Sequence, residues 1–381
     1  MEQRRQDFVM EVLMGQMPKS NICEKYSISR VTGDKWLQRY RNGEALSDRS
    51  REPFRKPNKT AAEIEALIIE TRLKYPVWGP RKLVRFLSNA GASGLPSPST
   101  VGEILKRNGL VCKEASRAAT PYKRFERPHP NELWQADFKG HFQMQNDRRC
   151  HPLTILDDHS RYSLCVDAKE NERTPGVEAS FSRVFEEYGL PDAILCDNGP
   201  PWGTSQTTGY TRFEVWLMNR DILPIHGRPN HPQTQGKEER FHRTLKAEVL
   251  AQTPIKDLVH AQKEFDQFRN CYNHLRPHNA LNLDTPASRY TPASKRLKKI
   301  SDQWEYPPGY HLRRIKNTGF ITFNGQGYFL SEAFGGLTVA IRESSLPNCV
   351  NIYYRNFKVA RIDVDERVFT SRKIYRLDEN D

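Results

Sequence analysis

Apolar residues in the first part of the chain recur at helical spacing. Phe8, Val9, Val12 and Leu13 predict an amphipathic helix over residues 5–16. Further along, apolar positions 22–23 fit a short helix, residues 26–29 a tight turn, and positions 31, 36 and 37 a second helix. This is a helix-turn-helix layout, which would occupy residues 1–45. A plain helical hairpin produces the same pattern, so the motif alone leaves both interpretations open.

A linker over residues 46–59, rich in proline and charge, separates this segment from a second helical unit at 60–112. In that unit we expect one helix from Ala62 to Leu73, one after Gly79-Pro80, and one capped at 98–100 that stops at Gly109. Two basic helical units in tandem favour a bipartite DNA reader. A basic connector follows at 113–130.

Polar and basic side chains in these segments are the candidates for contact with phosphates and base edges. In the first unit they are Arg30, Thr32, Lys35, Gln38 and Arg39. In the second unit and the connector they are Arg81, Lys82, Ser99, Thr100, Lys106, Arg107, Lys123 and Arg124.

From residue 131 the pattern changes to strands with alternating and aromatic positions. Three strands in a meander precede a helix over 175–188, a strand over 193–197, a helix over 212–219 and a short strand near 222–226. Helical runs over 236–250 and 256–272 complete the region. The pattern predicts a mixed α/β domain at 131–294.

After a basic hinge at 295–299, strand-like segments return. Turn residues at 324–327 and 355–356 separate alternating runs, so residues 309–365 predict a small β-barrel, followed by a tail at 366–381.

Composition narrows the class of protein. Among 381 residues, 37% are hydrophobic, which excludes wholesale disorder, and no run of eighteen apolar residues is present to span a membrane. The amino-terminal segment shows no signal-peptide pattern. The seven cysteines form no CxxC pair, so we do not expect a disulfide framework. Reduced cysteines of this kind predict a cytoplasmic location.

The charge of the chain is concentrated near its beginning. Lys plus Arg number 59 against 46 for Asp plus Glu, a formal net charge of +13. Residues 1–130 carry 25 basic and 14 acidic residues, whereas the remainder carries 34 and 32. This asymmetry fits contact with a polyanion, and it fits a solvated basic face equally well.

Three acidic residues of the α/β domain are candidate metal ligands. Asp137 lies late in the first strand, Asp197 ends an apolar strand before Asn-Gly-Pro-Pro, and Glu239 lies in the first turns of the helix that begins at Gly236. Two strand ends and a helix can bring three carboxylates to one point, where they suit Mg²⁺ or Mn²⁺. Two ions there would clamp the attacking and leaving oxygens of a phosphoryl displacement. Taken singly, each residue is better explained as a cap or turn former.

Helical geometry separates Glu238 from Glu239. Glu238 lies along the stripe of Phe241, Leu245 and Val249, whereas Glu239 lies about 100° away, on the face with Arg243 and Lys246. The spacing therefore favours Glu239 as the ligand, although an ordinary salt bridge fits it too. Asp157 and Asp158 are better explained as turn and scaffold residues, although periodicity leaves Asp158 open as a distant helper of the site.

The sequence resembles a known family at these positions. WQADF (134–138), LCDNG (195–199), HPQTQGKEERFHRTLK (231–246) and YNHLRPH (272–278) are similar to the retroviral-integrase-like core of bacterial insertion-sequence transposases. ISR (28–30), WGPRKL (78–83) and PST (98–100) resemble transposases with tandem helix-turn-helix units.

The resemblance implies an RNase H-like fold with a mixed five-stranded sheet, an SH3-like carboxyl-terminal barrel, and an Asp-Asp-Glu triad at Asp137, Asp197 and Glu239. It implies two Mg²⁺ (or Mn²⁺) ions, a homodimer or larger assembly, and a bacterial, nucleoid-associated location. Two features depart from retroviral integrases. Asp197 and Glu239 lie 42 positions apart, and the amino terminus has no zinc-binding His/His/Cys/Cys arrangement.

The implied activity is cleavage at the ends of an insertion sequence and joining of the 3′-hydroxyl ends to target DNA. Cations beside the triad would contact this DNA, although a solvated surface fits them too: Lys237, Arg240, Arg243 and Lys246. Two other functions stay open: a transposase-derived DNA-binding regulator without catalysis, and a metal-dependent nuclease that cuts but never joins.

Overall fold

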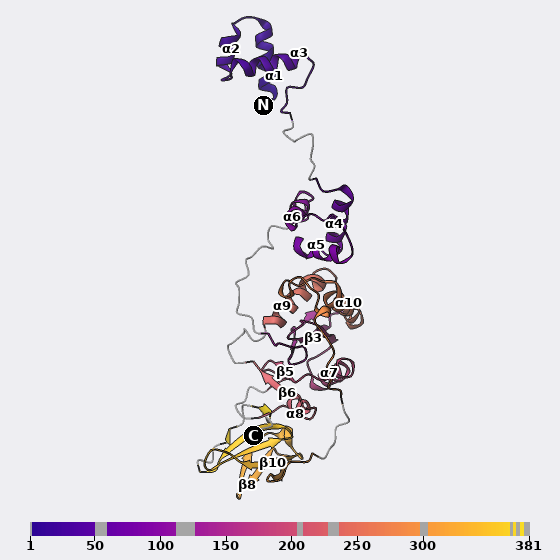
Figure 1. The fold of residues 1–381 in the computed structure, drawn as a ribbon, viewed down its shortest axis with the longest axis vertical. Coiled ribbons are helices and arrows are strands. Elements are labelled where there is room, and N and C mark those ends of the chain that lie inside the picture. Colours follow the sequence, from indigo (N-terminus) through magenta and orange to yellow (C-terminus); the bar gives the residue numbers. More distant parts are fainter. Residues whose placement is uncertain are drawn as a thin grey trace. The chain divides into compact units, whose positions relative to one another are not determined.

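The structure is a computed structural model that describes residues 2–49, 59–111, 126–203, 209–227, 236–297, 304–365, 369–370 and 374–376 (Figure 1). The chain divides into two compact units, Met1–Lys59 and Thr60–Asp381. Lys123 and Arg124, most of the predicted linker and connector, and most of the tail lie outside the described residues.

Three helices form the first unit: α1 (Glu2–Met14), α2 (Lys19–Lys25) and α3 (Arg30–Arg41). Ser29 caps α3, because its Oγ accepts a hydrogen bond from the Thr32 amide at 3.1 Å. Gly33 lets α3 approach α1 closely, since a Cβ there would lie 2.8 Å from Cζ of Phe8. The core consists of Phe8, Val9, Ile22, Cys23, Leu37 and Leu46.

The second unit begins with another three helices, α4 (Ala62–Lys74), α5 (Pro80–Asn89) and α6 (Pro98–Arg107). The cap of α6 is Ser97, one residue before the predicted capping segment; its Oγ accepts from the Thr100 amide at 3.3 Å. Side chains from all three helices and from the turn before α5 form one buried core: Ile68, Trp78, Leu83, Leu87, Val101, Ile104 and Leu105.

The central sheet is mixed, as the strand and helix order predicts. Its strands are β1 (Trp134–Phe138), β2 (Phe142–Gln143), β3 (Arg149–Asp157), β4 (Ser163–Lys169), β5 (Ala193–Cys196) and β6 (Leu223–His226). The long sheet runs β4-β3-β1-β5-β6, and the short β2, which the sequence pattern did not predict, pairs with β3. The first three of these pair antiparallel, whereas β1, β5 and β6 are parallel.

Helices cover both faces of this sheet (Figure 1). On one face, α7 (Thr174–Tyr188) and α8 (Arg212–Met218) pack on the apolar side chains of β1 and β3. On the other, α9 (Gly236–Leu245) and α10 (Leu258–Asn270) pack on β3 and β4. Each of these two helices ends in a π-helical turn, η3 (Lys246–Leu250) and η4 (Cys271–Leu275). Short 3₁₀ turns follow at η5 (Asn279–Leu281) and η6 (Pro286–Ser288).

The carboxyl-terminal strands form antiparallel sheets. They are β7 (His311–Arg314), β8 (Phe320–Phe323), β9 (Gln326–Phe329), β10 (Thr338–Glu343), β11 (Cys349–Tyr354), β12 (Phe357–Asp363), β13 (Phe369–Thr370) and β14 (Tyr375–Arg376), with a 3₁₀ turn η7 (Glu332–Phe334). Hairpin turns occur where predicted, since Asn324, Gly325 and Arg355 all have positive φ.

The predicted barrel is not confirmed. Among the described residues, β13-β12-β11-β10-β7 form an open sheet with β14 beside β12, and β8 and β9 form a separate hairpin. The strands share one core with the β8–β9 hairpin and η7, and Tyr210 and the α8 residues Val215 and Met218 belong to the same core. None of the described helices has the length and apolarity that crossing a membrane requires.

Candidate active site

Asp137 and Asp197 lie at one edge of the central sheet. The parallel register pairs Trp134 with Ile194 and Gln135 with Leu195, so two positions further along each chain Asp137 reaches the level of Asp197. Asp137 also faces Thr154 across the antiparallel pair with β3. The amide of Gly199 donates to Asp197 Oδ1 at 3.0 Å, which holds the turn that follows β5.

The electrostatic setting of these two aspartates is unfavourable without a cation. Burial raises the pKa of Asp137 to about 7, and the negative charge of Asp197 contributes next. The charges with the largest effect on Asp137 are all negative: Asp197, then Glu172 and Glu239. Burial also raises the pKa of Asp197. Two carboxylates in such a setting suit a hard divalent cation.

The helix α9 presents two glutamates near Asp137, and they differ in burial. Glu238 is 1% exposed, as helical spacing predicts, and accepts a hydrogen bond from Thr154 Oγ1 at 3.1 Å. Its other oxygen, Oε1, is buried without a hydrogen-bond partner. Burial, and then the charge of Asp137, raises the pKa of Glu238 well above its ordinary value. Glu239 is exposed, and its charge reaches Asp137 only weakly.

The three predicted ligands therefore lie in one region of the domain, but their carboxylates do not converge on one point. Within the ranges that the structure describes, no set of three or more His, Cys, Asp or Glu side chains is arranged to hold a metal ion. Asp137 and Asp197 fit such an ion by their chemistry and electrostatics, whereas Glu239 is turned toward solvent.

Sequence reasoning missed two groups that belong to this region. Glu172 follows β4 in a loop and acts on the pKa of both aspartates, and its Oε1 lies 2.8 Å from His151 Nδ1. Thr154 Oγ1 lies 3.0 Å from the carbonyl oxygen of Asp137, so its one hydroxyl hydrogen is shared between that oxygen and Glu238. A lone hydroxyl inside the apolar run PLTILD was a usable signal for Thr154. For Glu172 no local signal exists.

The predicted DNA-contacting residues of α3 divide by exposure. Arg30, Lys35 and Gln38 are exposed. Thr32 is half-buried at the start of the helix, and Arg39 is half-buried because its Nη2 donates to the carbonyl oxygens of Ala45 and Ser47.

In the second helical unit, Arg81, Ser99, Thr100 and Lys106 are exposed. Arg107 pairs with Glu65, with Nε to Oε1 at 3.2 Å. Lys82 is half-buried, and burial followed by the positive charge of Arg276 lowers its pKa to about 7.

The cations of α9 also divide. Arg240, Arg243 and Lys246 are exposed along the helix and its π-helical turn. Lys237 is instead paired with the buried carboxylate of Asp158.

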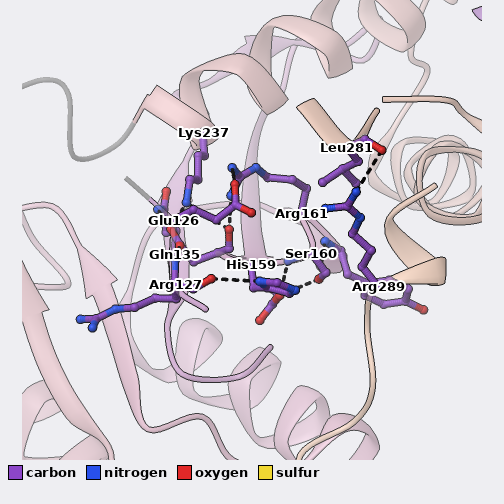
Figure 2. Close-up of polar contacts among 12 residues, drawn as sticks. Glu126, Arg127, Gln135, His159, Ser160, Arg161, Lys237, Leu281 and Arg289 are labelled. Atoms are coloured by element: carbon purple, nitrogen blue, oxygen red, sulfur yellow. Dashed lines mark hydrogen bonds and ion pairs between the residues drawn. The ribbon is translucent and has the colours of Figure 1, made fainter. Parts of the chain in front are cut away.

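Asp157 and Asp158 act as scaffold residues, as predicted. Asp157 accepts from the amides of Asn131 and Ser160, both at 2.7 Å, which closes the turn after β3. The neighbouring network, in which His159 Nδ1 lies 2.9 Å from the carbonyl oxygen of Arg127, is drawn in Figure 2.

Family models match four segments of the chain. An integrase core domain model matches residues 127–232, and a second integrase core model matches residues 220–286. A homeodomain-like domain matches residues 32–105, and the carboxyl-terminal domain of IS481 family transposases matches residues 310–370.

Curated relatives include proteins of bacterial insertion elements. A 39.2 kDa protein of insertion element IS476 from Xanthomonas euvesicatoria is 24% identical over 273 residues, which cover 70% of this chain and 76% of that protein. A 31.7 kDa protein of IS407 from Burkholderia multivorans is 27% identical, over 42% of this chain and 54% of that protein. The Gag-Pro-Pol polyprotein of simian retrovirus SRV-1 is 30% identical over 47% of this chain and 10% of its own length.

Among solved structures, the HTLV-2 integrase catalytic core domain in complex with magnesium is similar with a TM-score of 0.34 and 19% identity, over 43% of this chain and 99% of that chain. A simian T-cell lymphotropic virus intasome in complex with a PP2A regulatory subunit has a TM-score of 0.38 and 14% identity, over 83% and 99%.

A mixed sheet flanked by helices, matched by two integrase core models and preceded by a homeodomain-like match, defines an integrase-core protein with a helix-turn-helix region. Such helix-turn-helix and integrase domains imply DNA binding. With the IS481-type carboxyl-terminal match and the insertion-element relatives, the chain is similar to insertion-sequence transposases.

Proposed function

We propose that the protein is a DNA transposase that cleaves the ends of its insertion sequence and joins the freed 3′-hydroxyls to target DNA. The observation that carries this proposal is the pair of Asp137 and Asp197 on adjacent parallel strands, with the pKa of Asp137 raised by burial and by the charge of Asp197. A site that accumulates negative charge in this way favours binding of a divalent cation, because the cation stabilises both carboxylates in their ionised form.

Asp137, Asp197 and Glu239 are the residues we propose as metal ligands, with two Mg²⁺ or Mn²⁺ ions in the active form. When bound, such ions polarise the phosphoryl oxygens and activate the attacking water or hydroxyl. The exposed cations Arg240, Arg243 and Lys246 lie on the same helix as Glu239 and are suited to hold the phosphodiester backbone beside it.

DNA-end binding is proposed for the two helical units, at 1–45 and 60–112. Exposed polar and basic residues on α3 and α6 support this role. We also propose that the active species is a dimer or larger, because two element ends must be held together for joining.

The test is incubation with duplexes that carry the element's own terminal repeats, with Mg²⁺ or Mn²⁺, followed by mapping of nicked ends and of joined products. We expect wild type to nick at the element end and to join that end covalently to target DNA. Asp137→Asn should abolish both steps and retain duplex binding. Nicking without joining would support a nuclease instead, and activity that survives in Asp137→Asn would reject the proposed site.

A regulator without catalysis is the second candidate. The observation in its favour is that, in the part of the chain that the structure describes, the three carboxylates are not assembled to hold a metal. Specific binding of the terminal repeat with no nicking at any metal concentration would support it.

A further inference from the structure

Asp158 stands at a junction of three segments. It directly follows β3, and its side chain is 0% exposed. Its Oδ1 accepts from Gln135 Nε2 of β1 at 2.6 Å and pairs with Lys237 Nζ of α9. Its Oδ2 accepts from the backbone amide of Arg127, upstream of β1, at 2.8 Å. One carboxylate therefore joins β1, α9 and the segment that enters the domain.

The contacts of Lys237 are directed into this junction. Its Nζ also donates to the carbonyl oxygen of Asp158 at 3.0 Å, and its side chain is only 16% exposed. Burial and then the charge of Arg161 lower the pKa of Lys237 to about 8, while Asp158 opposes the shift. Arg161 itself pairs with Glu126 at 2.6 Å. Figure 2 shows Lys237, Gln135, Arg161 and Glu126 converging from separate elements.

Gln135 and Lys237, which both bond to Asp158 Oδ1, lie close in sequence to the proposed metal ligands. Gln135 lies two residues before Asp137 on β1, and Lys237 lies two residues before Glu239 on α9. The same oxygen of Asp158 thus ties together the two elements that carry these acidic residues. The first turn of a helix leaves its amides unbonded within the helix, so an external contact there has a large effect on local order.

We propose that Asp158 is a positioning residue of the active site: by holding Lys237 and Gln135 on one oxygen, it sets the first turn of α9, and with it Glu239, against β1. This inference rests on the proposed function for its catalytic consequence. It assigns to Lys237 an internal structural contact in place of the DNA contact that its position in the sequence suggests.

The experiment compares Asp158→Asn, Lys237→Gln and Lys237→Arg in the full chain, with the exposed Asp192→Asn as the matched control. Two experiments are done on each variant: hydrogen exchange of the amides in peptides that cover residues 236–245, and kinetics of strand joining, which give kcat and KM. We expect Asp158→Asn and Lys237→Gln to speed exchange in 236–245 and to lower kcat roughly 10- to 100-fold with KM for DNA little changed. Lys237→Arg should recover most of the loss, and Asp192→Asn should match wild type.

Lys237→Gln decides the case if Asp158→Asn fails to fold, because Lys237 is the less buried partner. Unchanged exchange in 236–245 in Lys237→Gln would overturn the proposal. So would a raised KM with a shallower salt dependence and unchanged kcat, which is the result expected if Lys237 binds DNA phosphates. A wild type that cannot join DNA would reject the proposed function alone, since hydrogen exchange tests the tether without catalysis.

Discussion

Two neighbouring glutamates on α9 illustrate how one position changes the surroundings of a carboxylate. Glu238 is hydrogen-bonded to Thr154, and the charge of Asp137 helps to raise its pKa. Glu239 instead faces solvent on the side of the helix that carries Arg243. A buried carboxylate without a full set of partners costs free energy, while an exposed one costs little. The two residues should therefore respond differently to the same substitution.

Glu239→Gln should lower kcat for end cleavage on the order of 100-fold or more, because it removes a proposed metal ligand. Glu238→Gln should leave kcat within about tenfold of wild type, since the amide keeps the shape and the hydrogen bond to Thr154. Both rates are measured on the same terminal-repeat duplex at saturating Mg²⁺. The reverse order of effects would assign the third ligand to Glu238.

Asp137 makes stability depend on pH and on metal. Its pKa of about 7 in the folded protein lies above that of an unfolded aspartate, near 3.9. Between these values the folded state keeps a proton that the unfolded state has released, so the contribution of Asp137 to stability falls as pH rises from about 4 to 7.

In the absence of metal, Asp137→Asn should therefore be more stable than wild type at pH 8, by on the order of 2 kcal/mol. The difference should vanish below about pH 4, and Mg²⁺ should raise the unfolding temperature of wild type but not of the variant. Thermal unfolding in EDTA and in Mg²⁺ measures both effects, with Asp192→Asn as the control. Equal stability of the variant and wild type at pH 8 in EDTA would mean that the ionised Asp137 carboxylate does not destabilise the folded protein.

Among the elements, α9 depends on its apolar side for its place in the fold. Phe241 is buried, with its ring centroid 4.8 Å from that of Tyr272 and 5.7 Å from that of Phe268. These contacts fasten α9 to α10 and η4, while Lys237 fastens its beginning to Asp158. The proposed ligand Glu239 lies between the two attachments.

Phe241→Ala should lower the free energy of unfolding by about 3–5 kcal/mol, because it removes a large buried aromatic side chain and leaves a cavity. Val259→Ala, on the exposed side of α10, should change it by less than about 0.5 kcal/mol. Urea unfolding of both variants measures the difference. A small loss for Phe241→Ala would show that the space beneath α9 collapses readily.

The helix α8 shows how an element can serve two cores. Phe213 and Leu217 face the central sheet, whereas Val215 and Met218 face the carboxyl-terminal strands. Ser331 Oγ donates to the carbonyl oxygen of Tyr210 at 2.7 Å, so a hydrogen bond joins the carboxyl-terminal segment to the residues just before α8. The helix therefore buries part of the apolar face of the strands, which do not close into a barrel among the described residues.

Over the whole chain, the excess of positive charge lies in the first 130 residues, where 25 basic residues stand against 14 acidic ones. Binding through phosphates releases counterions, so the affinity should fall steeply with salt, with a slope of about −0.9 for each neutralised phosphate. The central domain, which is nearly balanced in charge, should contribute less to this slope.

Arg30→Gln combined with Lys35→Gln should reduce the slope of log affinity against log salt by about 2 for terminal-repeat DNA. Arg148→Gln, an exposed arginine in a turn of the central domain, should leave the slope unchanged. Fluorescence anisotropy over a salt series measures the slopes. An unchanged slope in the double variant would remove α3 from the DNA-binding surface.

The elements of this protein follow from local pattern to a large extent. The helices of both amino-terminal units, the succession of strands and helices along the central domain, and the hairpin turns near Gly325 and Arg355 agree with periodicity and turn chemistry. The burial of Glu238 also follows from its spacing to Phe241 and Leu245. These features depend on contacts within a few residues or on the periodic spacing of apolar residues, and both can be identified in a single sequence.

Partners far apart along the chain could not be read in this way. From the sequence, Lys237 is a surface cation, whereas the structure pairs it with Asp158, 79 positions earlier. Glu172 is a loop residue in the sequence, whereas in the structure its charge raises the pKa of Asp137. The sequence predicts a barrel over residues 309–365, yet the described strands form an open sheet and a separate hairpin, and α8 contributes side chains to their core. Such outcomes depend on which surfaces meet, and the free energy of burying a charge or an apolar face is set by the element that arrives opposite to it.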